Sequence, residues 1–551
     1  MYITLDGNYA VKKFLLNTPA NINLNWVDKL RIEQEFKRMP DSTWVLANEN
    51  TYVNFYIVKG AQQLYAHQLR NFDKYQFDVQ NADSIFGLLG PIHELPEATA
   101  QTDTFWIHNR HVPLKEKESA LDDLLAQLRK VPAFNVIIKT AEILITGYIP
   151  TTADKDKSKF DFGPMNTTFS ANHLEGFRMR VGGMTTANLN PHWFGSGYLA
   201  YGVNDRKLKY NAKLTYSVNK KKYHEGESPV NNISAIQEYD VYTPGQDFLF
   251  TSKDNMFVAW KVGEPVTMMQ YIRKTMLQYQ KEWLNGLTLT TWARNENNEA
   301  AGTLRYDRYN ADGTLTNLKS FTNTELGAQL RFAPGERAYN GREGKNSLFN
   351  LSKDAPVFKL SHQMGLKNVL GSDFNYNHTE ISAEKRIWLS SFGHIDALVT
   401  AGKVWDKVPF PLLIMPNTNQ SITIQPQAFN MMRALEFVSD QYVSFYFTYY
   451  MKGWILNRIP GVKWLRLREV ISFSGFYGGL TDKNNPALDP TGLYRFPEGT
   501  SPMGRTPYLE ASVGLENIFK ILRIDYYRRL TYLDQPNIKK GGVRIALRFS
   551  F

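Results

Sequence analysis

The chain has 551 residues, of which 13% are aromatic: 30 Tyr, 33 Phe and 11 Trp. It contains no cysteine, which excludes disulfides and thiolate metal sites, and it has no run of about 18 apolar residues that could form a transmembrane helix. A net charge of +11 fits nucleic-acid binding, but the basic residues are scattered singly, which argues against that function. The aromatic excess is typical of the two interfacial girdles of a membrane β-barrel.

Residues 1–165 are predicted to form a separate, β-rich, water-exposed domain on the periplasmic side of the membrane. A hairpin on the Asp6-Gly7 turn and strands at 43–46 and 51–57 are indicated by β-formers between turn residues. One amphipathic helix is predicted at about 115–130, because four leucines have helical spacing: Leu121, Leu124, Leu125 and Leu128. We expect this leucine stripe to pack on the neighbouring sheet. The polar segment 151–159 marks the boundary to the next domain.

From about residue 172 onward, apolar and polar residues alternate over long segments. After a turn at 202–206, the segment 208–218 puts Leu and Tyr on one face and Lys, Asn and Thr on the other. Similar alternation recurs at 177–181, 326–332, 395–401, 443–451, 509–515 and 522–526. Many of these segments reach the nine to eleven residues of membrane strands. The sequence therefore predicts an all-β protein with a minor helix, in which residues 166–551 form a transmembrane antiparallel β-barrel of about fourteen strands, within a range of 12 to 16.

The loops of this barrel are predicted to differ in length at its two ends. Long polar segments at 219–256, 333–353, 414–436 and 480–505 alternate with tight turns such as Asn204-Asp205. Long loops at one end and short turns at the other are typical of outer-membrane barrels.

The last nine residues form the most regular strand pattern of the chain. One face is apolar (Val543, Ile545, Leu547, Phe549 and Phe551) and the other carries Arg544, Ala546, Arg548 and Ser550. A strand between lipid and water needs such faces, and a terminal Phe resembles the assembly signal of bacterial outer-membrane barrels. An edge strand of a soluble sandwich is the alternative interpretation. Export also requires a signal peptide, and Met1 to Gly7 lack its basic start and apolar core, so we expect residue 1 to lie inside a longer protein.

Several short motifs resemble one family. They are Glu175 to Arg180, Tyr201-Gly202, Asp205, Lys209-Tyr210, Trp106, Arg110, Pro113-Leu114, Gly402 to Val404, Val408-Pro409, Pro411 to Leu413, Ile459-Pro460, Leu465-Arg466 and Arg468-Glu469. Together they resemble a Bacteroidota outer-membrane β-barrel family of unassigned function, usually labelled carboxypeptidase-like regulatory domain-containing proteins. The resemblance implies a signal peptide and an immunoglobulin-like regulatory domain upstream in full-length members, and it implies no peptidase.

A weaker similarity points to the superfamily of outer-membrane assembly and two-partner secretion barrels. It rests on the Glu-Gly-Phe-Arg stretch at 175–178 and on the closing strands. The characteristic Arg-Gly-Phe/Tyr loop motif of that superfamily is not matched, because the nearest stretch reads Arg433-Ala434-Leu435-Glu436-Phe437.

Motifs for catalysis are incomplete, so we predict no catalytic residue, no metal site and no cofactor. His93-Glu94 has no second His at zinc-protease spacing, and the pair His108 and His111 has no carboxylate at ligand spacing. The stretch 341–347 imitates a phosphate loop, but Tyr339 replaces its first Gly.

Charged residues at alternate positions are candidates for the barrel lumen: Arg178, Arg180, Arg466, Arg468, Glu469, Arg544 and Arg548. They would either line a basic interior that favours anionic solutes, or pair with Glu469, Glu510, Glu516 and Asp525 in cross-strand ladders. The pairing is favoured because unpaired buried charge is costly.

These features favour a non-enzymatic protein of the cell outer membrane, acting in transport or as an accessory subunit of an assembly or export complex. Expected partners are outer-membrane lipid and lipopolysaccharide, the barrel assembly machinery during biogenesis, and subunits of an outer-membrane complex, but no nucleic acid. The alternatives are an outer-membrane hydrolase with a lumenal or surface site, and a soluble nucleic-acid-binding β protein.

Overall fold

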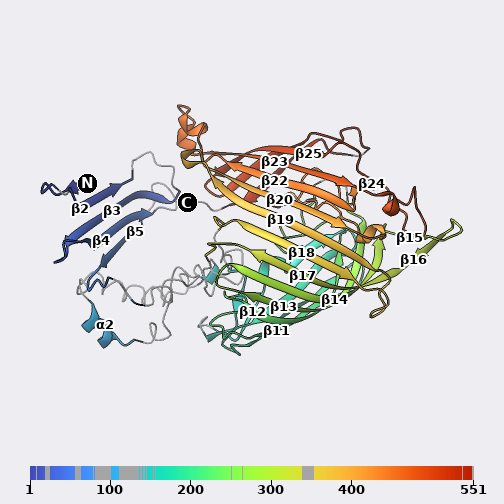
Figure 1. The fold of residues 1–551 in the computed structure, drawn as a ribbon, viewed down its shortest axis with the longest axis horizontal. Coiled ribbons are helices and arrows are strands. Elements are labelled where there is room, and N and C mark those ends of the chain that lie inside the picture. Colours follow the sequence, from blue (N-terminus) through green and yellow to red (C-terminus); the bar gives the residue numbers. More distant parts are fainter. Residues whose placement is uncertain are drawn as a thin grey trace.

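The computed structural model describes residues 1–7, 9–18, 25–55, 64–77, 80, 101–110, 136, 139–140, 143, 146–152, 154, 157–249, 251–262, 265–337, 353–536 and 538–548. It contains a small N-terminal sheet and a large closed barrel (Figure 1). The helix predicted at 115–130 lies outside the described residues. The described part includes a short helix, α2 (Asp103–Asn109), whose N-cap Thr102 accepts a hydrogen bond from the backbone of Phe105.

The N-terminal sheet has five antiparallel strands in sequence order. They are β1 (Tyr2–Ile3), β2 (Val11–Asn17), β3 (Val27–Arg38), β4 (Trp44–Phe55) and β5 (Leu64–Asn71). The hairpin on Asp6-Gly7 is confirmed by the pairing of β1 with β2. The two strands predicted at 43–46 and 51–57 are one strand, because the polar residues Asn48 to Asn50 pair with both β3 and β5 instead of turning.

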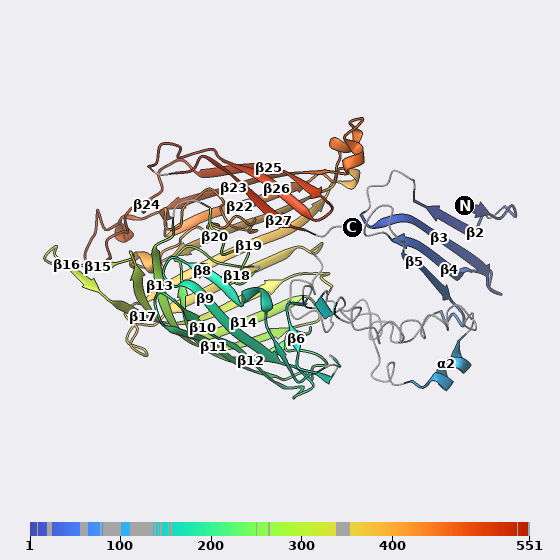
Figure 2. The same cartoon turned by 180° about the vertical axis from the view of Figure 1, so that it is seen from behind.

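The barrel is a single antiparallel sheet that closes on itself. Its strands are β6 (Ile149–Pro150), β7 (Phe160–Phe162), β8 (Phe169–Asn172), β9 (Gly176–Thr185), β10 (Trp193–Gly202), β11 (Leu208–Ser217), β12 (Asn231–Tyr242), β13 (Met268–Glu282), β14 (Leu287–Gly302), β17 (Ser320–Phe332), β18 (Val357–Gly365), β19 (Tyr376–Trp388), β20 (His394–Val404), β22 (Gln441–Tyr450), β23 (Arg468–Gly479), β25 (Tyr508–Ile518), β26 (Leu522–Arg529) and β27 (Gly541–Leu547). The sheet closes where β27 adjoins β6, and Figure 2 brings these first and last strands into one view.

The predicted count of about fourteen strands is wrong, because the closed sheet contains eighteen within the described residues. Three of them, β6, β7 and β8, have only two to four residues, too few for alternation to be visible in the sequence. β7 and β8 pair with successive parts of β9, so they share one position in the sheet. β12 lies inside the segment 219–256, for which the sequence predicts a loop. The barrel sheet begins with β6 and β7, ahead of the expected boundary at residue 166.

The two ends of the barrel differ. At one end, which we call the loop end, lie the connections 243–267, 303–319, 405–440 and 480–507. These connections carry short elements of their own: the hairpin of β15 (Tyr306–Tyr309) and β16 (Leu315–Leu318), and β21 (Phe437–Val438), which pairs in parallel with β24 (Ser501–Pro502). The segment 333–353, also predicted as a long loop, joins β17 to β18 and therefore lies at the opposite end.

The N-terminal sheet lies at this opposite end (Figure 1). Asn25 and Trp26 directly precede β3 of this sheet. Asn25 donates a 2.5 Å hydrogen bond to Asn517, and Lys520 lies 4.6 Å from the ring centroid of Trp26. Asn517 and Lys520 lie where β25 turns into β26. We call this the sheet end.

The two faces of the barrel strands follow the alternation in the sequence. On β11, Leu208, Leu214 and Tyr216 are exposed on the outer face, whereas Lys209 and Thr215 on the inner face are fully buried. The predicted faces of β9 are likewise confirmed, with Met179 exposed between inward-facing arginines. In the described part of the chain, no helix is long and apolar enough to cross a bilayer.

Candidate functional site

Two loops of the loop end fold inward and pair with each other inside the barrel. Thr418 donates to the carbonyl of Gly245 at 3.0 Å, and Val262 donates to the carbonyl of Gln420 at 2.8 Å. Lys261 and Ser421 form an isolated antiparallel bridge. We call the described residues of 243–262 and 405–440 the plug, because both loops contact inward-facing residues of the barrel wall.

The first contact between plug and wall is a buried charge network around Arg178 of β9. The Arg178 guanidinium donates to both carboxylate oxygens of Asp240 on β12, at 2.8 and 2.9 Å, and to Glu175 at 2.7 Å. Asp254 of the plug lies 3.2 Å from Arg178 and 2.7 Å from Arg180. The opposite charges in this network therefore hold the 243–262 loop against β9 and β12.

The network is balanced in charge and largely buried. Lys209 pairs with Glu175 at 2.7 Å and with Asp205 at 2.5 Å, and Lys253 pairs with Asp240 and Asp254. It thus contains four cations and four anions in the described residues: Arg178, Arg180, Lys209 and Lys253 against Glu175, Asp205, Asp240 and Asp254. Burial alone would raise the pKa of Asp254, but the attraction of Lys253 and Arg178 lowers it below its usual range.

The second contact lies on the last three strands. Glu510 of β25 accepts hydrogen bonds from the backbone of Asn430 and Met431, at 2.8 and 2.9 Å. Arg529 of β26 donates two hydrogen bonds to the carboxylate of Glu436 in the plug, at 3.0 and 2.6 Å, and both side chains are fully buried. Arg544 of β27 donates to the carbonyl of Asn430 at 2.6 Å. Three neighbouring strands thus anchor residues 430–436.

The plug also extends the barrel sheet at β27. Ile545 donates its backbone N–H to Ile422, and Ile424 donates to Ile545, at 2.9 and 2.8 Å. Thr423 forms a parallel bridge with Ile545. Because β6 has two residues and β27 has seven, β6 alone is too short to pair with the whole edge of β27. The segment 422–424 satisfies part of that edge.

Aromatic side chains pack the loop end into a solid core. One cluster gathers buried residues of several loops and strands: Leu304, Tyr306, Phe321, Tyr376, Val404, Val408, Phe410, Leu413, Leu435, Val438 and Tyr494. A second contains Phe429, Met432, Phe437, Phe476 and Tyr508. Burial of this apolar surface stabilises the plug in addition to its charged contacts.

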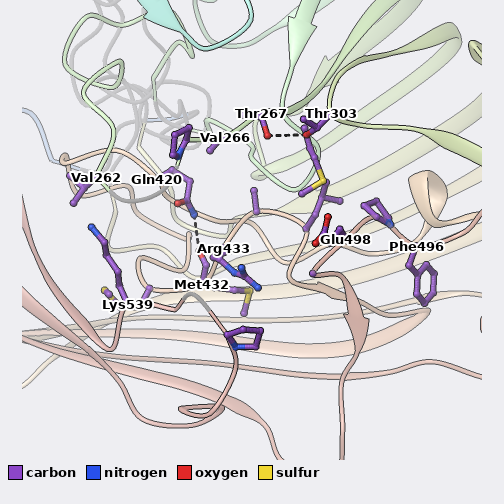
Figure 3. A pocket seen from close by; sticks show the side chains of 18 of the residues that line it. Val262, Val266, Thr267, Thr303, Gln420, Met432, Arg433, Phe496, Glu498 and Lys539 are labelled. Atoms are coloured by element: carbon purple, nitrogen blue, oxygen red, sulfur yellow. Dashed lines mark hydrogen bonds between the residues drawn. The ribbon is translucent and has the colours of Figure 1, made fainter.

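A cavity of about 870 Å³ remains between the plug and the neighbouring loops (Figure 3). Its described lining comes from five separate connections, from β27 and from the first residue of β13, Met268. Thr267 and Thr303 are hydrogen-bonded at 2.9 Å on one wall, and Gln420 donates to the carbonyl of Met432 at 2.8 Å on another. Arg433, Lys539 and Glu498 also line it.

Five of the seven charged residues predicted for the lumen fall into three groups. Arg178 and Arg180 belong to the network described above, and Arg544 anchors the plug. Arg468 is buried at the start of β23 opposite Glu516, and Arg548 lies 3.5 Å from Glu516.

The other two predicted lumen residues lie elsewhere. Arg466 is in the loop before β23 with a left-handed φ of 53°. Glu469 accepts hydrogen bonds from the backbone of Ile455 and Leu456 in the preceding loop. Of the predicted C-terminal strand, Val543 and Leu547 are exposed on the outer face, whereas Phe549 and Phe551 lie outside the described residues.

Sequence reasoning missed the plug partners Asp240, Asp254 and Glu436. Asp240 carries a usable signal, since it continues the alternation Asn232, Ser234, Glu238 along β12. Asp254 and Glu436 carry no such signal, because they lie in long loops, where the local sequence does not indicate which residue they will contact in the folded protein.

One lysine of the plug is shielded from solvent. Lys261 is 5.5 Å from the ring centroid of Phe248, and burial lowers its pKa to about 8. In the described part of the chain, no three His, Asp or Glu side chains gather as a metal site would require.

The fold and site together define a closed β-barrel with an outward apolar face and a lumen filled by its own loops. The chain belongs to the family of unknown function DUF5686, whose C-terminal domain matches residues 141–483. No curated protein matches the sequence.

The solved structures to which the chain is similar include the following two. One is BamA from Haemophilus ducreyi lacking POTRA domains 1–3, with a TM-score of 0.42, 10% identity, and coverage of 75% of this chain and 78% of that one. The other is CdiB from Acinetobacter baumannii, with a TM-score of 0.33, 11% identity, and coverage of 68% of this chain and 57% of that one.

Proposed function

We propose that this chain is an integral, non-enzymatic outer-membrane barrel that transports a solute through a lumen gated by its plug. The observation that carries the proposal is the outer surface of the closed sheet. Its middle is aliphatic and exposed, with Leu214 at 52% and Val513 at 66%. Only a closed sheet leaves no unpaired strand edge in lipid, and such a band is what the hydrocarbon core requires.

Aromatic residues border this band at both ends. Trp193, Tyr216 and Trp388 are exposed near the sheet end, and Tyr201, Trp405 and Tyr477 near the loop end. Tryptophan and tyrosine are enriched where membrane strands leave the hydrocarbon region. The interior is instead lined by buried ionic residues, which suits a lumen and not the core of a soluble sandwich.

The plug supports transport with gating and argues against a permanently open pore. Its contacts to β9, β12 and β25 to β27 include charge pairs and hydrogen bonds, which water or a charged solute can replace. The wider Bacteroidota family resemblance, the outer-membrane location and the lipid and assembly-machinery partners are parts of the same proposal. The loop end is assigned to the cell exterior, because outer-membrane barrels carry long loops outside and short turns in the periplasm.

The absence of cysteine permits a clean test of this placement. We would introduce single cysteines at Leu488 of the loop end and at Leu5 of the N-terminal sheet, both exposed. In intact cells, a membrane-impermeant maleimide should label L488C, and it should label L5C only after the outer membrane is permeabilised. The protein should need detergent for extraction and should run faster on a gel unboiled than boiled. Extraction in low-salt buffer without detergent, or labelling of L5C in intact cells, would refute the proposal.

A second function, as accessory subunit of an assembly or export complex, is favoured by one projecting segment. The loop between β22 and β23 at the sheet end carries η6 (Leu456–Arg458) and η7 (Lys463–Leu465), and its Trp464 is 74% exposed (Figure 1). A large exposed tryptophan next to basic residues is typical of an interaction surface. A photo-crosslinking residue at Trp464 should capture one stoichiometric protein if this function holds, and lipid alone if it does not.

A further inference from the structure

The loop-end cavity has an excess of positive charge. Five basic side chains line it, Arg305, Arg433, Arg495, Lys539 and Arg544, against two acidic ones, Asp307 and Glu498, which leaves a net charge of +3 among the described lining residues. Within this lining, Arg495 forms an ion pair with a carboxylate, at 2.5 Å from Asp307.

Three of the other cations form no ion pair with a carboxylate in the described part of the chain. The buried carboxylate of Glu510 attracts Arg544 electrostatically, but no ion pair joins the two side chains. Arg305 donates to the carbonyls of Gly302 and Leu304, which leaves its charge uncompensated. Arg544 is only 3% exposed, its terminal nitrogens bond two carbonyls, and its Nε has no hydrogen-bond partner among the described residues. The Nε of Arg433 is likewise buried without such a partner. Buried donors in this state are costly unless a ligand or water satisfies them.

The same cavity offers an apolar surface. Met431, Met432 and Leu435 of the plug line it together with Phe496 and Pro497 of the 480–507 loop. Methionine side chains adapt to ligands of irregular shape, and a mixed apolar and basic lining is common in small-molecule sites of this volume. Figure 3 shows Arg433, Lys539 and Phe496 around the same space.

We propose that this cavity binds a soluble organic anion, namely a carboxylate or phosphate attached to an aromatic or short acyl body. Arginine forks bind such oxyanions with two parallel hydrogen bonds, and Lys539 adds a point charge. The plug contributes residues 430–435 to the lining, so an occupied cavity contacts the element that closes the lumen. The proposal names a substrate class for the transport function given above. It rests on that function, because the transport function implies that the anion arrives from outside the cell.

Binding is measured on the purified full-length chain in a non-ionic detergent, which makes the result independent of transport. The probe is 8-hydroxypyrene-1,3,6-trisulfonate, a water-soluble aromatic anion, followed by fluorescence anisotropy. Saturable binding is expected. Phenyl phosphate should compete with it, whereas benzyl alcohol and inorganic phosphate at the same concentration should compete at least about tenfold more weakly.

Two variants and a matched control assign the site. R433Q and K539Q should each weaken probe binding at least about tenfold, since each loses a charge-assisted contact. K319Q removes the same charge from an exposed residue at the loop end that does not line the cavity, and it should bind like the parent. All variants must keep the faster migration of the unboiled barrel.

Three results would overturn the proposal. The first is the lack of saturable probe binding. The second is equal competition by inorganic phosphate, which would show that the site does not recognise an apolar body. The third is an equal loss of binding in K319Q, which would show general attraction to a basic surface. A failure here with correct L488C and L5C labelling rejects the anion site and leaves the membrane function standing.

Discussion

The pair Arg529–Glu436 provides the sharpest test of the plug. It joins β26 to the 405–440 loop by two hydrogen bonds at 3.0 and 2.6 Å, with both side chains fully buried. Substitution R529M removes the guanidinium and leaves the Glu436 carboxylate buried. The carboxylate then keeps a hydrogen bond from the backbone of Arg433, at 3.0 Å.

The expected cost follows from the physics of a broken buried pair. Removing one partner of such a pair destabilises a protein by about 3–5 kcal/mol, because an uncompensated charge remains in a poorly solvated place. Replacing both partners by apolar residues of similar volume is often close to neutral. The double variant R529M/E436L should therefore recover most of the stability that R529M or E436L loses. In R529M the carboxylate can regain water only if the loop moves away from β26, so that variant should also open the lumen.

Stability is measured as the urea concentration at which the unboiled gel band disappears, and opening as conductance in planar bilayers. R529M should lower the urea midpoint and raise conductance, and R529M/E436L should move both toward the parent values. The pair Arg331–Glu336 gives a matched control outside the plug: two bonds of 2.7 Å join the last residues of β17 to the loop that follows it at the sheet end. R331M should leave conductance unchanged. If the losses of the two single variants simply add in the double variant, the pair is not coupled and the argument fails.

Two further predictions concern the plug and the last strand. Burial lowers the pKa of Lys261 to about 8, from 10.5 for an ordinary lysine. Between pH 8 and pH 10.5, Lys261 therefore binds more protons when the loop is released than when it is packed. The packed state gains stability as the pH rises through this range, by at most about 3 kcal/mol. Conductance should accordingly be lower at pH 10 than at pH 7, and K261M should flatten this dependence; an unchanged slope in K261M would assign it to another group. Phe551→Asp should block assembly and not activity, because an Asp near the interface costs only about 1 kcal/mol while the last strand resembles an assembly signal; pulse-labelled chains should be degraded in the periplasm, and normal outer-membrane levels would contradict the prediction.

The barrel could be predicted from the sequence because its strands are long and one face of each meets an apolar environment. Alternation in 208–218 or 509–515 is visible at a glance, and the structure places those residues on β11 and β25. The short strands β6, β7 and β8 could not be found, since two to four residues carry no period. β12 was not predicted as a strand, because its inner face is so polar that the segment resembles a loop.

Of the residues that join the plug to the barrel, only those on the barrel strands could be predicted from the sequence. Arg178 and Arg544 stand at alternate positions of strands, and this spacing alone marks them as inward-facing. Their partners in the plug, Asp254 and the carbonyl of Asn430, come from long connections. The direction in which a long connection folds depends on tertiary packing, such as the aromatic cluster around Tyr306, and no local pattern encodes it.

The two plug loops are anchored on opposite sides of the place where the sheet closes. Asp254 is held by β9 and by the network that includes β12, whereas Asn430 and Glu436 are held by β25, β26 and β27. Between these strands lies the junction of β27 with the two-residue β6, and the plug segment 422–424 exchanges hydrogen bonds with Ile545 there. Closure of the lumen and closure of the sheet are therefore coupled. A plug that leaves the lumen also takes backbone partners from β27, and an unpaired backbone group in lipid costs several kcal/mol. This coupling favours limited rearrangement of the plug over its complete expulsion.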